Sequence, residues 1–462
     1  MKWFREEIEY FIVAFLFVGV FFLIHGTLKS VGVQLPADTY ANHLFVQTSV
    51  HRVDIFLQNK DYEHLLDSPE QKTKFHANVS IDGDYLSNVA FSTRGNASLG
   101  DLATRGEDFN RFSYKIDFNK FENSQSYYGL DELVLNNLYA DPSGMRDFLA
   151  FEIMRAAGVE TPLTSYTMVY LNGRKIGLYL AVEEIEQSFL RRNNASPDAS
   201  LFKPEPLVEN RYKVLKLAEA LPGGEEDLHL KYDSSKPDFD FEGADLIYMS
   251  DDLADYAAIF DNEVTKVSPA DRTRIIEAIK SLSTGENVEE YWDVDALVKY
   301  FAAHNFVVNS DSYTGYTAHN YLLRMSHGKM TMLPWDYNLA FQNLWLTEDL
   351  MTPEKQRSWD INNPLLGPDL DSRPLWRIIA ENEEYMEKYH AALQNLLDTF
   401  LISGDCSEKL DDTYMMIRPY LEADWRKFYP IEEMDEGVEY LEEFIYYRSD
   451  WVQKQLWGIE VL

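Results

Sequence analysis

Alternation of apolar and polar residues is the clearest pattern in the first part of the chain. Residues 111–118 read RFSYKIDF, so an aromatic or aliphatic side chain recurs at every second position, as on one face of a β-strand. Runs of β-forming residues also flank Asp82-Gly83 and Asn172-Gly173. Asp-Gly and Asn-Gly between such runs favour two-residue turns, so both places are predicted to be β-hairpins.

Helical spacing dominates the rest of the chain. Apolar residues recur every three or four positions in Met145–Ala157, Pro269–Leu282 and Val294–Asn309, and the chain from Pro374 onward has heptad-like aromatic and leucine spacing. Between them, Tyr321–Leu333 is a third predicted hairpin. Strands early and helices late indicate an α+β protein with a β-rich N-terminal lobe. The predicted division is 45–182 for the β-rich lobe, 183–373 for a second lobe with a loop-rich insertion at 194–245, and 374–462 for a C-terminal helical region.

The N-terminus carries one strongly apolar segment, residues 10–28, that stands apart from these patterns. Its length approaches the roughly 20 residues that span a bilayer, and no small-residue cleavage site follows it. We predict an uncleaved single-pass anchor, with 1–9 as a tail and 29–44 as a linker; a cleaved signal peptide and a buried core helix are the alternatives. Lys2 and Arg5 precede the segment, which favours a main domain outside the cytoplasm, at the cell surface, or secreted if the segment is cleaved.

Composition excludes several classes of protein. Hydrophobic residues make up 45% of the 462 residues and aromatic residues 14%, which is enough for a packed core, so the chain is not globally disordered. The 42 basic and 77 acidic residues leave a net charge of −35, which argues against nucleic-acid binding. Such a surface would attract basic proteins or cations, or would serve only solubility. Cys406 is the only cysteine, which excludes an intrachain disulfide and a CxxC zinc site.

Three oxygen-bearing residues surround the hairpin predicted over Tyr321–Leu333. Asp311 closes the preceding helical pattern, Asn320 comes directly before the first strand, and Asp336 follows the second. Carboxylate and amide oxygens are hard ligands suited to Mg²⁺, which commonly takes one or two carboxylates together with substrate phosphates. Each acid alone is more simply a cap of a loop or turn, but the three together favour a functional site.

Lys115 lies on the polar face of residues 111–118, where a lysine is by default solvated. Glu152 lies in the helix predicted over Met145–Ala157, on a face with apolar character, and a buried carboxylate needs a partner. We predict an ion pair between Lys115 and Glu152, the arrangement by which protein kinases hold ATP phosphates. Arg146, on the same helix, would pair with another acid.

The loop Arg94-Gly95-Asn96-Ala97-Ser98 leaves a predicted strand and is a candidate phosphate contact. Its glycine allows close approach of the backbone, and Asn96 and Ser98 offer hydrogen bonds to phosphate. The signal is weak alone, because the chain has no GxGxxG, Walker, HExxH or GxSxG motif.

Six stretches together resemble the CotH kinase family, named for a spore coat protein H, and they occur in the family's order. The resemblance implies an atypical protein-kinase-like fold with a β-rich N-lobe and a helical C-lobe. It implies ATP-dependent phosphorylation of Ser (or Thr) in partner proteins, with Mg²⁺ (or Mn²⁺). The stretches are STRGNAS (92–98), RFSYKIDF (111–118), LVLNNLYADPSGMRDFLAFEIMRAAGVETP (133–162), YLNGRKIGLYLAVEEIEQSFL (170–190), YFAAHNFVVNSDSYTGYTAHNYLL (300–323) and MLPWDYNLAF (332–341).

The resemblance also implies roles for individual residues. Lys115 matches the phosphate-binding lysine of the β-rich lobe, and Glu152 matches its helix partner. Asp311 matches the catalytic base that accepts the proton of the substrate hydroxyl. Asn320 and Asp336 match the ligands of the metal ion. The loop containing Arg94, Asn96 and Ser98 stands where the family has a turn near the nucleotide.

Two positions depart from the family pattern and keep other functions open. Asn338 stands where a second Asp is usual, and Gln342 replaces a closing glycine. The main rival is therefore a membrane-anchored surface or structural protein that binds a partner on this fold without turnover. Transfer of a nucleotide rather than a phosphate would use the same residues, and a metal-dependent hydrolase would need the acids but not Lys115. The acidic surface suits a basic, Ser-rich protein substrate.

Overall fold

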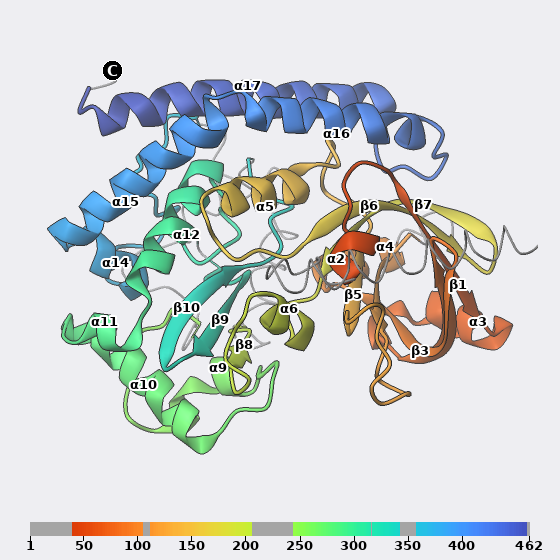
Figure 1. Cartoon of the computed structure of the whole chain (residues 1–462), viewed down its shortest axis with the longest axis horizontal. Helices are drawn as coiled ribbons and strands as arrows, with labels where there is room; N and C mark the ends of the chain where they lie inside the picture. The colour runs from red at the N-terminus through yellow and green to blue at the C-terminus, as the bar shows by residue number, and fades with distance from the viewer. Residues whose placement is uncertain (1–38, 105–110, 206–243, 316, 342–356, 460–462) are drawn as a thin grey trace, which may run out of the picture.

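The computed structural model describes residues 39–104, 111–205, 244–315, 317–341 and 357–459. Seven strands of the first half close into a barrel in the order β1-β2-β3-β4-β5-β7-β6 (Figure 1). Neighbouring strands pair antiparallel, except that β1 and β6 close the barrel as a parallel pair. The strands are β1 (His51–Leu57), β2 (Phe75–Ile81), β3 (Asp84–Arg94), β4 (Ser113–Asp117), β5 (Glu132–Asn136), β6 (Thr164–Leu171) and β7 (Arg174–Glu183).

Short helices and one longer helix interrupt the barrel strands. The longer one, α5, lies between β5 and β6 in sequence and packs against the helical part of the molecule through α12. Because it connects a barrel strand with the second half, α5 is one of the elements that joins the two halves. The helices are α2 (Tyr40–His43), α3 (Asn59–Asp67), the 3₁₀ turn η1 (Pro69–Gln71), α4 (Ala97–Thr104) and α5 (Arg146–Ala156).

The second half is helical around a small three-stranded sheet in the order β10-β9-β8. The strands are β8 (Ser200–Phe202), β9 (Tyr321–Ser326) and β10 (Lys329–Pro334). The helices are α6 (Gln187–Arg192), η3 (Leu253–Tyr256), α9 (Ala257–Phe260), α10 (Pro269–Thr284), α11 (Val288–Tyr291), α12 (Val294–Val307), α14 (Pro374–Ala380), α15 (Glu383–Leu396), the π-helical turn η4 (Leu397–Leu401), α16 (Asp405–Glu422) and α17 (Ile431–Leu456).

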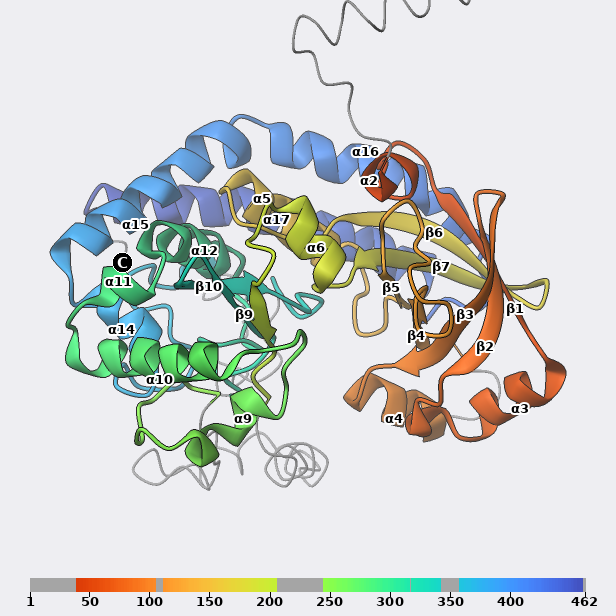
Figure 2. The ribbon, with the colours of Figure 1, turned by 60° about the horizontal axis from the view of Figure 1, so that its bottom comes forward.

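The last two helices, α16 and α17, pack against each other and form the top of the view in Figure 1, and α16 contacts β7 of the barrel. Figure 2 shows the same elements after a turn of 60°. Buried apolar residues form two clusters, one inside the barrel and one that extends from α5 through the helical half. The barrel cluster includes the alternating residues Phe112, Tyr114, Ile116 and Phe118, all fully buried, as the strand pattern predicts. The second cluster also includes residues of β5, β6 and β7, such as Val134, Tyr166 and Leu180, so the hydrophobic effect joins the two halves, together with the contacts of α5 and α16.

All three predicted hairpins are confirmed. Asp82-Gly83 joins β2 to β3, Asn172-Gly173 joins β6 to β7, and His327-Gly328 joins β9 to β10. Glycine has positive φ in each turn, a conformation that costs it little. The helices predicted from the spacing of Met145–Ala157 and Val294–Asn309 are present as α5 and α12, each two residues shorter than predicted.

The predicted fold class, a kinase-like two-lobed fold with an N-terminal transmembrane helix, is wrong. The strands form a closed seven-stranded barrel, because β1 pairs with β6 and leaves no open edge. Pairing between strands so distant in sequence has no local signal, so alternation alone could not predict it.

The predicted location, a single-pass membrane protein with its main domain outside the cytoplasm, is corrected as well. In the described ranges no helix is long and apolar enough to cross a bilayer. The predicted anchor at 10–28 and the tail at 1–9 lie outside those ranges, as do residues 206–243 of the predicted insertion and Gln342.

Candidate active site

Asp311 and Asn320 come together at the mouth of the β9–β10 hairpin. The chain leaves α12 through Val308, which has positive φ, and Asp311 follows three residues later. The side-chain amide of Asn320 donates to Asp311 twice, to Oδ2 at 2.9 Å and to the main-chain oxygen at 2.9 Å. Thr317 Oγ1 donates to Asp311 Oδ1 at 3.0 Å. These contacts fix the orientation of the carboxylate, as a general base requires.

Asp336 lies two residues beyond the end of β10 and adopts the left-handed conformation, with φ 58°. Aspartate tolerates this region better than most residues other than glycine. The next residue, Tyr337, donates its main-chain N–H to Asp147 Oδ1 at 2.8 Å. Asp147 lies in the first turn of α5 and is buried.

Asp147 is a second carboxylate near Asp336 that the sequence reasoning missed. Burial, followed by the negative charge of Asp336, raises the pKa of Asp147 to about 7. The available signal was an acid in the first turn of a predicted helix, but such acids commonly serve only the helix dipole. Its proximity to Asp336 depends on how α5 packs against the second half, which the sequence does not encode locally.

Lys115 does not pair with Glu152. Its Nζ lies 2.6 Å from Glu132 Oε2 on β5 and 3.2 Å from Glu184 Oε2, directly after β7. Although burial alone would lower it, the negative charges of Glu184 and Glu132 raise the pKa of Lys115 above its usual value, so the ammonium is charged. The predicted Lys115–Glu152 ion pair is therefore wrong.

Glu152 takes part in a different set of contacts on α5. It forms an ion pair with Arg155, one turn further along the helix, and accepts from Gln47 Nε2 at 2.9 Å. The prediction that this carboxylate needs a partner is correct, but an i,i+3 arginine on its own helix supplies it. The partners of Lys115 come instead from the barrel, since β5 pairs with β4 on one side and with β7 on the other.

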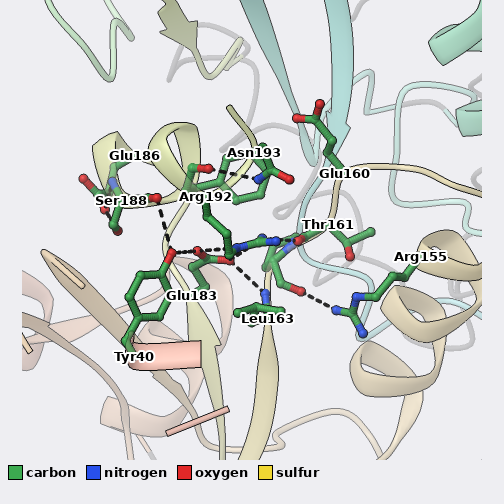
Figure 3. A network of polar contacts seen from close by, with 12 residues as sticks. Tyr40, Arg155, Glu160, Thr161, Leu163, Glu183, Glu186, Ser188, Arg192 and Asn193 are labelled. Atoms are coloured by element: carbon green, nitrogen blue, oxygen red, sulfur yellow. Dashed lines mark hydrogen bonds and ion pairs between the residues drawn. The ribbon is translucent and has the colours of Figure 1, made fainter. Parts of the chain in front are cut away.

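Glu184 is held in place by a buried network around its neighbour Glu183, which Figure 3 shows. Glu183 is fully buried, and its carboxylate accepts from Arg192 Nη2 at 2.6 Å, from the Leu163 N–H at 3.0 Å and from the Tyr40 hydroxyl. Consecutive side chains alternate in direction along a strand, so Glu183 anchors the end of β7 while Glu184 points toward Lys115. The network joins α2, β7 and α6, and it sets the position of Glu184.

Arg94 connects the barrel to the loop of Asp336. Its guanidinium stacks on the ring of Trp335, the residue before Asp336, at 4.7 Å from the centroid. Although burial alone would raise it, the positive charges of Lys115, Arg94 and Lys203 lower the pKa of Glu184 below its usual value. Arg94 is thus close both to the ion pair of Lys115 with Glu184 in the barrel and to Trp335 in the second half.

The rest of the 94–98 loop is placed differently. Asn96 is exposed, and its Oδ1 accepts from Lys72 Nζ at 2.5 Å. Ser98 is partly buried in the first turn of α4, beside Gly95, where an added Cβ would lie 3.1 Å from Ser98 Oγ. Three residues of this loop were predicted to contact a nucleotide. Arg94 is the one for which the structure gives a contact near other candidate residues, through Trp335 and Glu184.

The candidate residues carry oxygen donors of the type that binds Mg²⁺. Asp336, Asn320 and the nearby Asp147 supply carboxylate and amide oxygens, the ligand type that Mg²⁺ prefers. Among the described residues there is no group of three or more His, Cys, Asp or Glu that could hold a metal ion. Mg²⁺ keeps several waters and takes phosphate oxygens as further ligands, so it is usually held by only one or two protein carboxylates.

Comparison with known proteins gives the family. The model of the CotH kinase protein family matches residues 91–452. The chain belongs to the CotH kinase family. It is 24% identical over 367 residues to the inner spore coat protein H of Bacillus subtilis (strain 168), covering 77% of this chain and 87% of that protein. Membership supports a kinase-like function in general, and with it the use of ATP and a divalent metal.

A likeness to one solved structure is weak. The crystal structure of the Helicobacter pylori proinflammatory kinase CtkA matches over 75% of this chain and 95% of that chain, at 10% identity and a TM-score of 0.27. A score this low carries no argument about the fold or the site.

Proposed function

We propose that this CotH-family protein is a protein kinase that transfers the γ-phosphate of ATP to Ser or Thr hydroxyls of partner proteins, with Mg²⁺ or Mn²⁺ bound beside the nucleotide. The family supports the general class. The acceptor residue, the cation and the substrate are the parts that the proposal adds. The net charge of −35 favours a basic, Ser-rich substrate, because complementary charge speeds encounter.

One contact carries the proposal, the stacking of Arg94 on Trp335. It brings the loop of Asp336 to the side of the barrel where Lys115 and Glu184 form their ion pair, since Arg94 is also a charge neighbour of both. Phosphoryl transfer needs a cation on the phosphates, metal-binding oxygens and a base around one reacting group. Lys115, Asp336 and Asp311 offer these three chemistries.

Each residue then has a distinct task. Lys115, kept charged by Glu184 and Glu132, binds phosphate oxygens. Asp311 orients the acceptor hydroxyl and accepts its proton. Asn320 uses its amide N–H to hold Asp311, which leaves its carbonyl oxygen to join Asp336 as a metal ligand. When bound, the cation neutralises negative charge that develops on the transferred group.

The test is incorporation of label from γ-³²P-ATP by the full chain with Mg²⁺ or Mn²⁺. The acceptors are the protein itself, a Lys- and Arg-rich peptide with Ser, the same peptide with Ala for Ser, and an acidic Ser peptide. We expect label in the basic Ser peptide, lost in Asp311→Asn, Asp336→Asn and Lys115→Met. Asp261→Asn, an exposed acid on the loop after α9, is the matched control and should keep full activity.

Two outcomes would contradict the proposal. Label from α-³²P-ATP but not from γ-³²P-ATP would indicate nucleotide transfer by the same residues. No label in any acceptor, together with no change in Tm on adding ATP and Mg²⁺, would favour a binding protein without turnover. A kinase that binds Mg-ATP at a hundredfold excess over Kd should gain about 2.7 kcal/mol of stability from the ligand.

A further inference from the structure

His304 on α12 contacts both loops that carry the candidate carboxylates. Its Nδ1 lies 2.7 Å from the hydroxyl of Tyr337. Its Nε2 lies 2.8 Å from Thr314 Oγ1 and 3.3 Å from Ser312 Oγ. Ser312 directly follows Asp311, and Tyr337 directly follows Asp336. A single imidazole therefore joins the loop of the candidate base to the loop of the candidate metal ligand.

The cluster around His304 is closed to solvent and fully hydrogen-bonded. His304, Ser312, Thr314 and Tyr337 are each at most 1% exposed. Ser312 Oγ also donates to the main-chain oxygen of Asn309 at 2.7 Å, and this contact fixes the backbone next to Asp311. None of the polar side-chain atoms in this cluster lacks a hydrogen-bond partner.

The imidazole is a neutral group in this cluster. Burial lowers the pKa of His304 to about 3, so at neutral pH one ring nitrogen donates and the other accepts. Tyr300, one turn earlier on α12, stacks on the imidazole with ring centroids 5.5 Å apart. The hydroxyl of Tyr300 lies 3.1 Å from the hydroxyl of Tyr337. The ring is thus fixed in both position and orientation.

Tyr337 is held from two sides. Its hydroxyl meets His304, and its main-chain N–H donates to Asp147 on α5. Asp336, directly before Tyr337, takes the left-handed conformation, which is uncommon for residues other than glycine although aspartate tolerates it. The two hydrogen bonds of Tyr337 therefore fix the backbone directly after Asp336.

We propose that His304 is a positioning residue that sets the distance between Asp311 and Asp336 for phosphoryl transfer. This inference rests on the proposed function. A fully satisfied network of buried hydrogen bonds rigidifies the groups that it joins and holds them in one arrangement. That rigidity matters for catalysis, because a displacement of about 1 Å at a reacting centre costs on the order of a hundredfold in rate.

The test is a steady-state comparison of kcat and of KM for ATP in His304→Phe, Tyr337→Phe and Thr314→Val. Each variant removes one or more of the hydrogen bonds and keeps a similar shape. We expect kcat to fall at least tenfold in His304→Phe and several-fold in the other two, with KM for ATP within twofold of the wild type. The matched control is Tyr256→Phe, which removes the hydroxyl of a fully buried tyrosine that binds Met249 and Ser250 away from both loops.

Conservative variants of His304 distinguish a positioning role from a purely structural one, because recovery of kcat should follow the hydrogen bond that each variant restores. Asn at position 304 keeps a polar atom near Nδ1, and Gln keeps one near Nε2, so His304→Asn and His304→Gln should each recover part of kcat. Should His304→Phe fail to fold, Tyr337→Phe and Thr314→Val carry the test. Unchanged kcat in both, with an active wild type, would overturn this inference alone. An inactive wild type would overturn the proposed function and this inference together.

Discussion

Arg111 and Asp424 form a buried ion pair although they lie 313 residues apart in the chain, with Nη1 and Oδ2 at 2.9 Å. Both side chains are 2% exposed. Arg111 precedes β4 of the barrel, and Asp424 lies in the turn between α16 and α17. Asp424 also accepts from the Leu178 N–H of β7 at 3.3 Å, and Phe428 lies under the guanidinium. This contact fastens the C-terminal helices to the barrel.

Breaking the pair from one side should weaken the protein strongly. Asp424→Ala leaves the Arg111 guanidinium buried without its counter-charge, which typically costs about 3–5 kcal/mol. The double variant Arg111→Met/Asp424→Leu replaces both charges with apolar side chains, so we expect it to recover at least half of that loss. Urea unfolding followed by tryptophan fluorescence and by circular dichroism measures both. Equal stability of Asp424→Ala and wild type would show that the pair does not hold the barrel and helices together.

The hairpins could be predicted from sequence because their information is local. Asp82-Gly83 and Asn172-Gly173 are adjacent residues whose backbone preference specifies the turn, and the flanking strands follow directly. Closure of the barrel depends instead on the parallel pairing of His51 with Thr167, which no neighbouring residue signals. The fold class was therefore missed at the one contact that converts a row of strands into a barrel.

In the candidate site, too, local contacts could be predicted from the sequence and contacts between distant strands could not. Asp311 and Asn320 are nine residues apart around one loop, so their meeting could be anticipated. The partners of Lys115 depend on register: Lys115 pairs with Val134, which places Glu132 diagonally across on the same face. The antiparallel pairing of β5 with β7 brings Glu184 close to Lys115. The sequence does not give this register, so the ion pair was predicted by analogy with protein kinases, with the helix residue Glu152 as the partner of Lys115.

The two candidate partners of Lys115 can be separated by matched substitutions. Glu184→Gln removes a counter-charge of Lys115, so we expect the lysine to shift on the phosphates and kinase activity to fall at least tenfold. Glu152→Gln leaves Lys115 untouched and weakens the contacts of residue 152 with Arg155 and Gln47. Initial rates with γ-³²P-ATP compare the two variants, and their Tm values show that both are folded. A larger loss in Glu152→Gln than in Glu184→Gln would contradict the pairing seen in the structure.

The pH dependence of stability should carry a contribution from Glu186, the N-cap of α6 (Figure 3). Burial, with added repulsion from Asp131 and Glu132, raises the pKa of Glu186 from 4.5 to about 7 although Ser188 donates to it. Between these values the folded protein keeps a proton that the unfolded chain releases, so this contribution is complete below pH 4.5 and is lost as pH rises through 7.

Glu186→Gln tests that contribution because the amide is neutral at every pH. We expect the Tm of the variant relative to wild type to increase from pH 5 to pH 7 and to level off above pH 7.5. Differential scanning calorimetry of both proteins at five pH values measures the difference. A difference that stays constant over this range would show that Glu186 does not titrate in it.

Gly315 should be intolerant of any side chain because of its contact with the loop of Asp311. A Cβ at this position would lie 1.7 Å from the main-chain oxygen of Ser310, so the backbone beside Asp311 must move. We expect Gly315→Ala to lower the unfolding free energy by about 1–3 kcal/mol, as overpacking does, and to lower kcat at least tenfold. Gly100→Ala is the matched control, since a Cβ there meets no atom within 4 Å. Urea unfolding and γ-³²P-ATP assays compare the two, and full activity of Gly315→Ala would show that the position of this loop does not limit transfer.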